Sequence, residues 1–307
     1  MGPLLLHLAL LLLFPPLLVG GIGKVKAAFA GRRGAPLLQP YSDLARLLRK
    51  GAVYSRTTTW VFRAGPTVSL AATLSAALLV PLVGARAPLG FAGDLVLFAY
   101  LLALARFALL AAALDTGSSF EGMGASREAA FSSLAEPALL LVFAAVARVG
   151  GAPSFRSLLD PAAAGAWSIA GPPAVFLLAG CLFVLALAEN ARIPVDDPST
   201  HLELTMIHEA MVLDHSGPDL AFLLYAGALK LFLFGAILGR VLLPSPLGNP
   251  VLDGALFGGW MLLFAGLVGT VESTLARLRL DRVPHLLVSA CVLASCGLAV
   301  LVARGVR

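Results

Sequence analysis

The stretch AGDLVLFAYLLALARFALLAA, residues 92–112, is long and apolar enough to cross a membrane as a helix. A helix needs about 20 predominantly apolar residues to span the hydrocarbon core of a bilayer. Runs of this kind recur along the whole chain, in which 59% of the 307 residues are hydrophobic and 13% are charged. A soluble fold has no room to bury so many helices that are apolar on every side. The sequence therefore predicts an all-α, polytopic membrane protein.

The apolar runs predict about eight transmembrane helices within a single integral membrane domain, residues 1–307. No basic segment precedes the first run and no small-residue cleavage site follows it. It is therefore expected to be a retained span rather than a signal peptide. The expected spans cover residues 3–21, 65–83, 92–112, 131–150, 169–188, 219–243, 254–271 and 285–303.

Basic residues gather in two of the expected loops. Positively charged loops stay in the cytoplasm, so both loops are expected there, and an even number of spans then places both termini outside. The formal charge of +5 fits such loops and calls for no nucleic-acid partner. The basic residues of these loops are Lys24, Lys26, Arg32, Arg33, Arg46, Arg49, Lys50, Arg56 and Arg63 in the first, and Arg277, Arg279 and Arg282 in the last.

The first of these loops contains a short amphipathic pattern, LLQPYSDLARLLRKG, residues 37–51. Leu44, Leu47 and Leu48 share one face, with Ser42 as a candidate N-cap and Gly51 as the stop. Such a helix is expected to lie in the membrane interface. It acts either as an anchor that follows the positive-inside rule or as a docking surface for a soluble partner.

Three ionisable residues fall inside expected spans: Arg106, Glu136 and Lys230. Each costs about 2.5–3.5 kcal/mol at the centre of a bilayer, so such side chains normally face the bundle interior and pair. One interpretation is a structural salt bridge between Glu136 and either Lys230 or Arg106. The other is a proton path, because a desolvated carboxyl group can exchange protons near neutral pH. The sequence leaves both open.

The segment AENARIPVDDPSTHLELTMIHEAMVLDHSGPD, Ala188–Asp219, is the most densely titratable part of the chain. Pro194 and Pro198 should end the fifth helix, and a second helix is expected from His201 to Asp214. On that helix carboxylates would occupy one face and imidazoles another, which suits proton relay near neutral pH. A solvated acidic loop is the simpler alternative. The members of the two faces are Glu203, Ala210 and Asp214, and His201, His208 and His215.

A metal centre is a weak interpretation of this segment. His208 and Glu209 lack the second histidine of a zinc-binding H-E-x-x-H motif, and histidines seven residues apart on a helix are about 10 Å apart. The three cysteines also lack the C-x-x-C spacing of a metal or iron–sulfur site. No redox centre is therefore expected in this chain. The cysteines are Cys181, Cys291 and Cys296.

A second acidic segment, LDTGSSFEGMGASREAAFSSLAEP, covers Leu114–Pro137 and leads directly to Glu136. Its glycine-rich EGMG lacks the lysine and the preceding strand of a phosphate-binding P-loop. The expected topology places this loop on the same side as the basic loop. The acidic loops then form a charged vestibule that opens toward buried carboxylates. The charged residues of this segment are Asp115, Glu121, Arg127 and Glu128.

These motifs resemble the subunit 1 family of respiratory complex I over nearly the whole chain. Within that family, DDPSTHLELTMIHEAMVLDHSG and DTGSSFEGMGASRE are most similar to the membrane anchor of group 4 energy-converting [NiFe] hydrogenases, as in formate hydrogenlyase and hydrogenase-4. Quinone-reducing members have a shorter sequence in place of the first motif. A stand-alone transporter is disfavoured because the chain shows no inverted repeat, and a purely structural anchor leaves Glu136 and Lys230 unexplained.

The resemblance implies a subunit without cofactors in the inner (plasma) membrane of a prokaryote. It would dock a hydrophilic arm whose large and small subunits carry the [NiFe] centre and iron–sulfur clusters, beside antiporter-like membrane subunits in the lipid bilayer. It would couple electron transfer to movement of protons or Na⁺; the alternative is the quinone-binding subunit of a proton-pumping complex of the NADH-quinone oxidoreductase type. The implied junction and proton-path residues are Glu136, Glu189, Arg192, Asp196, Asp197, Glu203, Glu209 and Asp214, and the implied docking-loop residues are Arg32, Arg33, Gln39, Asp43 and Lys50.

Overall fold

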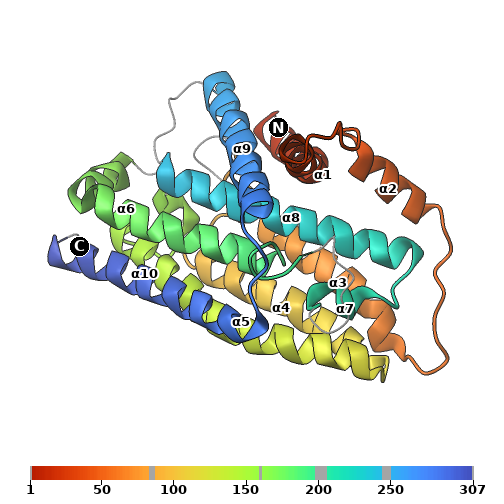
Figure 1. Ribbon diagram of the computed structural model, residues 1–307. Helices are drawn as coiled ribbons and strands as arrows, with labels where there is room; N and C mark the ends of the chain where they lie inside the picture. Colours follow the sequence, from red (N-terminus) through yellow and green to blue (C-terminus); the bar gives the residue numbers. More distant parts are fainter. Residues whose placement is uncertain (1, 83–86, 159–160, 198–205, 244–249, 306–307) are drawn as a thin grey trace.

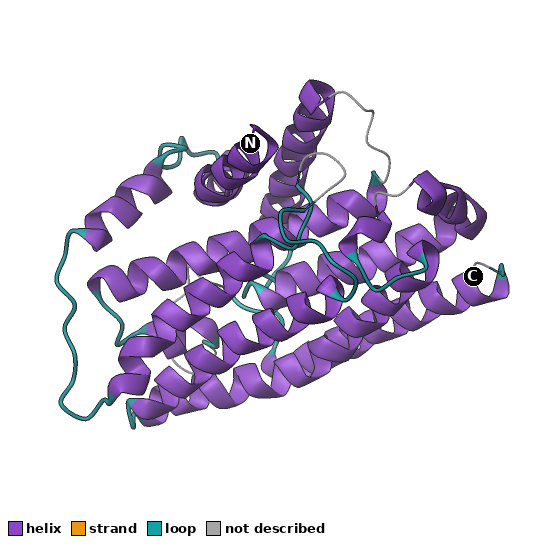
Figure 2. Ribbon diagram, turned by 180° about the vertical axis from the view of Figure 1, so that it is seen from behind, coloured by secondary structure: helices purple, strands orange, loops and turns teal. Residues whose placement is uncertain are grey.

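The computed structural model describes residues 2–82, 87–158, 161–197, 206–243 and 250–305. Over these residues all regular structure is helical, which confirms the predicted all-α class (Figure 2). Seven helices are long and apolar enough to cross a membrane, so this is a multi-pass membrane protein. The α-helices are α1 (Gly2–Phe29), α2 (Gln39–Leu48), α3 (Trp60–Ala77), α4 (Asp94–Asp115), α5 (Ser119–Gly150), α6 (Pro161–Glu189), α7 (His208–Val212), α8 (Gly217–Leu242), α9 (Pro250–Thr274) and α10 (Val283–Ala303).

The second expected span, residues 65–83, is the one not among these seven helices, and it corresponds to α3, which begins earlier and ends at Ala77. Its 18 residues extend about 27 Å, slightly less than the hydrocarbon core, and Arg63 lowers its hydropathy. The helix nevertheless packs antiparallel along α4. Asp115 at the end of α4 accepts hydrogen bonds from the Thr59 and Phe62 amides at the start of α3, at 2.6 and 3.2 Å. Thus α3 packs against α4 and α8 in the same helical bundle as the seven membrane-spanning helices.

Helix α1 contains the adjacent prolines Pro15 and Pro16, which cannot donate to the carbonyls of Leu11 and Leu12. The hydroxyl of Tyr225 on α8 donates to the Leu11 carbonyl at 2.8 Å and lies 3.4 Å from that of Leu12. A tyrosine thus satisfies the carbonyls that the prolines leave without a donor. Figure 1 shows α1 beside α9, which crosses the other long helices steeply.

Helix α6 ends well before its neighbours do. Glu189, its last residue, lies at the level of Lys230, which is thirteen residues into α8 and therefore about 20 Å from its start. The described residues that follow α6, 190–197 and 206–216, lie beyond its end, beside the first half of α8. They include α7, and their backbone is joined to the loop after α9 by the Leu278 amide, which donates to the Pro194 carbonyl at 2.9 Å.

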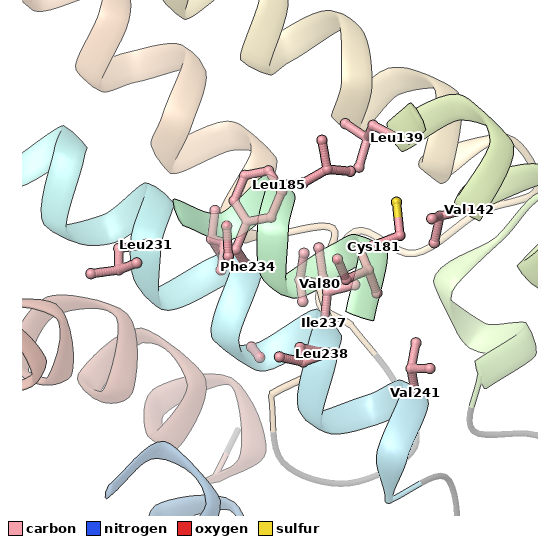
Figure 3. Packing of buried hydrophobic residues seen from close by; sticks show 14 of the residues in the cluster. Val80, Leu139, Val142, Cys181, Leu185, Leu231, Phe234, Ile237, Leu238 and Val241 are labelled. Atoms are coloured by element: carbon pink, nitrogen blue, oxygen red, sulfur yellow. The ribbon is translucent and has the colours of Figure 1, made fainter. Parts of the chain in front are cut away.

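The middle of α8 is sealed by apolar packing. Between Lys230 and Arg240 the helix reads LFLFGAILG, a rise of about 15 Å. Figure 3 shows Leu231, Phe234, Ile237 and Leu238 of this stretch among side chains of α5 and α6. The residues from Leu231 to Leu238 are all buried, and the two phenylalanines among them are fully buried. Over these residues α8 itself contributes no polar side chain to the core.

Three expectations about local structure were wrong in detail. The acidic segment Leu114–Pro137 is mostly helix, because α5 starts at Ser119 and runs unbroken through Pro137. The helix expected from His201 to Asp214 is described only over His208–Val212, and residues 198–205 lie outside the described part of the chain. The amphipathic helix α2 is present, but it is capped at Leu38, so Ser42 lies inside it.

Candidate functional site

Arg106 of α4 is the centre of a cluster of charged side chains. Its Nη1 lies 2.6 Å from Glu136 Oε1, its Nη2 lies 2.6 Å from both carboxylate oxygens of Glu189, and its Nε lies 3.6 Å from Glu128 Oε1. The Arg106 side chain is only 9% exposed. One guanidinium thus holds three carboxylates from two further helices, and the expected Arg106–Glu136 ion pair is present. We call these residues, together with Lys230, the Arg106 cluster.

Lys230 of α8 completes this cluster through Glu189 rather than through Glu136. Its Nζ lies 3.6 Å from Glu189 Oε2. Glu189 is the last residue of α6, where the helix dipole disfavours a carboxylate and favours cations. Arg106 and Lys230 therefore offset both the charge of Glu189 and the negative end of α6. Three carboxylates face two cations, so the fully ionised cluster carries one net negative charge.

A cavity of ≈ 390 Å³ lies beside the cluster, between α1, α2 and α8. Its wall is apolar along Pro16, Leu44 and Leu223 and titratable where it reaches Glu189 and Lys230. A second, smaller cavity of ≈ 20 Å³ lies behind Glu189, and a volume of this size holds about one water molecule. Glu189, Ala191 and Asp196 line both cavities, so the two lie on either side of these residues, next to the Arg106 cluster. The remaining titratable side chains of the larger cavity are Asp43, Arg192, Asp196, His208 and Glu209, and the smaller cavity adds Glu128.

Asp196 holds the segment after α6 in place. Its Oδ2 accepts from the backbone amides of Ile207 and His208, at 3.2 and 3.1 Å, and therefore caps α7 from eleven residues upstream. Its Oδ1 forms an ion pair with Arg277 at 2.8 Å. Asp196 is 1% exposed, so these bonds are shielded from solvent. It lines both cavities but serves first as a structural anchor.

A third group of charges joins α1 and α9 to the same segment. Glu272 of α9 is fully buried and lies 2.9 Å from Lys26 Nζ and 3.1 Å from Arg192 Nη1. Lys26 was expected in a loop but belongs to the last turn of α1. Arg192 is thus fixed by Glu272 while it lines the larger cavity. Glu272 was not singled out in the sequence, where it stands at the edge of an apolar run, and Arg277 was expected only as a basic loop residue.

Three of the expected site residues lie away from the cluster. Asp115 caps α3 and also accepts from the Thr59 hydroxyl at 2.8 Å. Glu121 is buried in the first turn of α5 and accepts from the Asp214 amide at 3.3 Å. Arg127 donates to the Met206 carbonyl at 3.0 Å. The first contact joins the end of α4 to the start of α3, and the other two join the segment before α8 to α5, so all three are structural.

The three histidines of the segment between α6 and α8 differ in their surroundings. His201 and Glu203 lie outside the described residues. His208 faces the larger cavity, and burial together with the nearby Lys230 lowers its pKa to about 4. His215 is stacked on the Phe62 ring, with centroids 4.1 Å apart, and neither of its ring nitrogens has a hydrogen-bond partner among the described residues. The expected row of imidazoles on one helix face is therefore wrong, since His215 lies beyond the end of α7.

Burial lowers the pKa of His215 to about 4, against the opposing effect of Asp219 and Asp214. The unfolded chain binds the proton near pH 6.5, so folding stability is lost as the pH falls from 6.5 toward 4. Between pH 7.5 and 5 the loss from this residue is about 2 kcal/mol. We expect His215→Phe, which retains the stacking, to lower this acid sensitivity, measured as the difference in apparent Tm between the two pH values in detergent. An unchanged difference would contradict a buried neutral imidazole.

The expected docking-loop residues lie before α2, on it and just after it. Gln39 donates to Asp43 at 3.0 Å, and Asp43 also pairs with Arg46 one turn later. Asp43 and Leu44 form part of the cavity wall, so α2 covers the cavity with one face. Its other face is exposed, as are Arg32, Arg33 and Lys50. This arrangement leaves a basic surface directly over the cavity.

Comparison with known proteins gives consistent matches over the whole chain. The family model described as NADH dehydrogenase matches residues 3–303. The chain is 32% identical to formate hydrogenlyase subunit 4 of Escherichia coli (strain K12), over 92% of each chain. It is 30% identical to hydrogenase-4 component C of the same strain, over 90% of this chain and 88% of the relative. A chain from the structure of the membrane-bound sulfane sulfur reductase (MBS), an archaeal respiratory membrane complex, shares its fold, with a TM-score of 0.82 at 20% identity, covering 98% of this chain and 100% of that one.

Proposed function

This chain belongs to the NADH dehydrogenase family, and from that premise we propose that it is the non-redox membrane subunit of a membrane-bound [NiFe] hydrogenase. The proposed role is to dock the hydrophilic arm and to couple its electron transfer to translocation of protons or Na⁺. The two relatives named as formate hydrogenlyase and hydrogenase-4 components support the hydrogenase branch, because each matches about nine tenths of the chain. The partners proposed are the hydrogenase large and small subunits and antiporter-like membrane subunits.

The observation that carries the proposal is the Arg106 cluster at the inner end of the two cavities. Three carboxylates share two cations in a poorly solvated site, so the cluster has one net negative charge that a proton or a Na⁺ ion would neutralise. Uncompensated charge is expensive inside a membrane, so uptake of a cation at this site is favourable. A change of charge on the docked arm would change the affinity of the cluster for this cation, because the charged residues of the cavity wall lie between the arm and the cluster.

The arm itself is proposed to dock at the cytoplasmic end, on α2 and on the basic residues before and after it. The [NiFe] centre and the iron–sulfur clusters then belong to the partner subunits. Among the described residues, no group of three His, Cys, Asp or Glu side chains is arranged to hold a metal ion. The part proposed for this chain in energy conversion is electrostatic, and it is carried by Glu189, Lys230 and Arg106 together with Glu136 and Glu128.

A variant of Glu136, the most exposed residue of the Arg106 cluster, tests the proposed coupling between electron transfer and ion movement. We expect Glu136→Gln to keep the complex assembled and to lower the number of ions moved per turnover at least fivefold. The reason is that glutamine keeps the hydrogen bond to Arg106 but cannot bind a proton. The measurement is ion uptake by vesicles containing the purified complex, followed with a pH-sensitive dye and with ²²Na⁺, normalised to hydrogenase activity.

The matched control is Asp281→Asn, because Asp281 is exposed near the start of α10 and pairs only with Arg279 at 3.4 Å. This control should behave as the unmodified complex does. If Glu136→Gln also retains full ion uptake per turnover, the cluster has no role in translocation. Loss of assembly in Glu136→Gln would instead assign this carboxylate a structural role.

The quinone-binding subunit of a complex of the NADH-quinone oxidoreductase type is the second candidate, and the larger cavity favours it. Its volume of ≈ 390 Å³ and its mixed apolar and polar wall suit a small amphipathic ligand. Leu224→Trp would narrow the cavity without changing its charge. If the complex reduces a soluble quinone analogue and this variant stops that reaction while hydrogenase activity persists, the second function is favoured over the first.

A further inference from the structure

Glu136 is the member of the Arg106 cluster that reaches the outside of the bundle. Its side chain is 49% exposed, whereas the side chains of Arg106, Glu189, Glu128 and Lys230 are between 6% and 20% exposed. Glu136 lies on a helix whose apolar half spans the membrane. A carboxylate that faces lipid at this position is costly, and charged side chains in spans normally face protein or water. The outward face of α5 therefore requires a polar neighbour.

The residues around Glu136 give this face a composition unlike that of the neighbouring helix. Between Ser126 and Ala144 one set of its exposed positions recurs at alternating steps of four and three along α5, and all of these except Leu140 are small or proline. The exposed side chains of α4 are large and apolar, as expected for a lipid-facing helix. The residues of this set on α5 are Ser126, Ala130, Ser133, Pro137, Leu140 and Ala144, the other exposed residues of α5 are Ser119, Ala129, Glu136 and Arg148, and those of α4 are Val96, Leu97, Tyr100, Leu104, Phe107 and Leu114.

Small side chains at these steps let a second helix approach closely, which is how transmembrane helices associate in a solvent as apolar as they are. Close approach would cover Glu136 with protein in place of lipid. The net negative charge of the Arg106 cluster defines the chemistry of the approaching helix, because a donor or a cation beside Glu136 lowers the electrostatic energy of the whole cluster. Figure 1 shows α5 at the edge of the bundle with α10 along part of it, so its outward face is accessible from the side.

We propose that the outward face of α5 binds a transmembrane helix of another membrane subunit, and that this helix presents a hydrogen-bond donor or a cation to Glu136. The inference rests on the proposed function only in that the chain works inside a membrane complex. It does not require that Glu136 moves ions. The proposed ion translocation and the proposed helix contact can therefore fail separately. Ion uptake by the Glu136→Gln variant tests the first, whereas cross-linking between α5 and a neighbouring subunit tests the second.

Site-specific photo-cross-linking in intact membranes tests the contact. A benzophenone amino acid is placed at Ser133 and at Leu140 on the proposed face and, as the matched control, at Leu104 on the apolar face of α4. We expect the α5 positions to give an adduct with an integral membrane subunit of the purified complex, at least tenfold above the Leu104 position. Adducts with lipid alone, or with a soluble subunit of the arm, would overturn the proposal.

A steric variant supplies an independent readout. Ala144→Phe places a bulky apolar group on the proposed face, which a lipid would accept and a closely packed helix would not. We expect the membrane partner to be lost from the purified complex at least fivefold, while the same substitution at Leu104 leaves it in place. Retention of the partner in both variants, with the chain folded to the same apparent Tm, would contradict close packing at α5.

Discussion

Replacing Arg106 with glutamine is expected to lower the stability of the folded chain by about 3–5 kcal/mol, because it leaves three carboxylates in a buried site without their common partner. Glu189 and Glu136 each lie 2.6 Å from the guanidinium, and Glu189 remains in contact only with the more distant Lys230. A neutral amide cannot replace three ion pairs. We expect a fall in apparent Tm of more than 10 °C in detergent and a strong loss of assembled complex.

The matched control for this variant is Arg148→Gln, near the end of α5, where the arginine is exposed. Its effect should remain within about 0.5 kcal/mol, as for most surface substitutions. The double variant Arg106→Gln with Glu189→Gln removes one stranded charge together with the cation and should recover part of the lost stability. An Arg106→Gln protein as stable as the unmodified chain would exclude the buried network.

Replacing Asp196 with alanine is expected to have the second-largest effect, again about 3–5 kcal/mol, because it removes a buried charge that has several partners. The amides of Ile207 and His208 would lose their acceptor, and Arg277 would be left without its 2.8 Å ion pair. The segment between α6 and α8 should then open. Limited proteolysis of the complex, with cleavage sites mapped by mass spectrometry, should show new cuts between α6 and α8.

The same substitution at the exposed Asp281 provides the baseline for this measurement. Asp196→Asn offers a graded test, since an amide oxygen still accepts from the backbone but no longer balances Arg277. We expect an intermediate loss of stability for Asp196→Asn. If Asp196→Ala is as resistant to proteolysis as Asp281→Ala, the α7 cap does not stabilise this segment.

The spans could be predicted from the sequence because lipid imposes one simple rule, about 20 apolar residues for each crossing. Seven of the eight expected segments meet this rule as helices in the structure. The rule failed for details that depend on tertiary contacts. The end of α6 at Glu189 lies one residue from the expected end of the fifth span, whereas the sequence could not show that α5 starts at Ser119 and includes the polar residues before Phe131. Partners far away in the chain, such as Asp214 and Met206, contact this polar part of α5.

The charged site shows the same division. The free-energy cost of placing a charge in the membrane indicated that Arg106, Glu136 and Lys230 must be paired. The Arg106–Glu136 pair was among the expected ones. The contact of Glu189 with both Arg106 and Lys230 was not predicted. Glu189 was expected at the junction only because of the family resemblance, and its contact with Arg106 depends on where α6 ends. Glu272 was missed because a single charge at the edge of an apolar run is usually an interfacial residue, and only the packing of α9 against α1 shows otherwise. Arg277 was expected as a basic loop residue, but its ion pair with Asp196 was not.

The apolar stretch of α8 between Lys230 and Arg240 also determines where a membrane voltage acts. A low-dielectric segment about 15 Å long and without ionisable groups is where an electric potential falls most steeply. Charges in the Arg106 cluster lie on one side of that segment, and Arg240 lies on the other. Each elementary charge that crosses the full potential gains or loses about 2.3 kcal/mol per 100 mV. Under the proposed function, an ion that reaches the cluster from the cavity would have performed only part of this electrical work, and the apolar stretch of α8 would keep the rest from being discharged through this subunit.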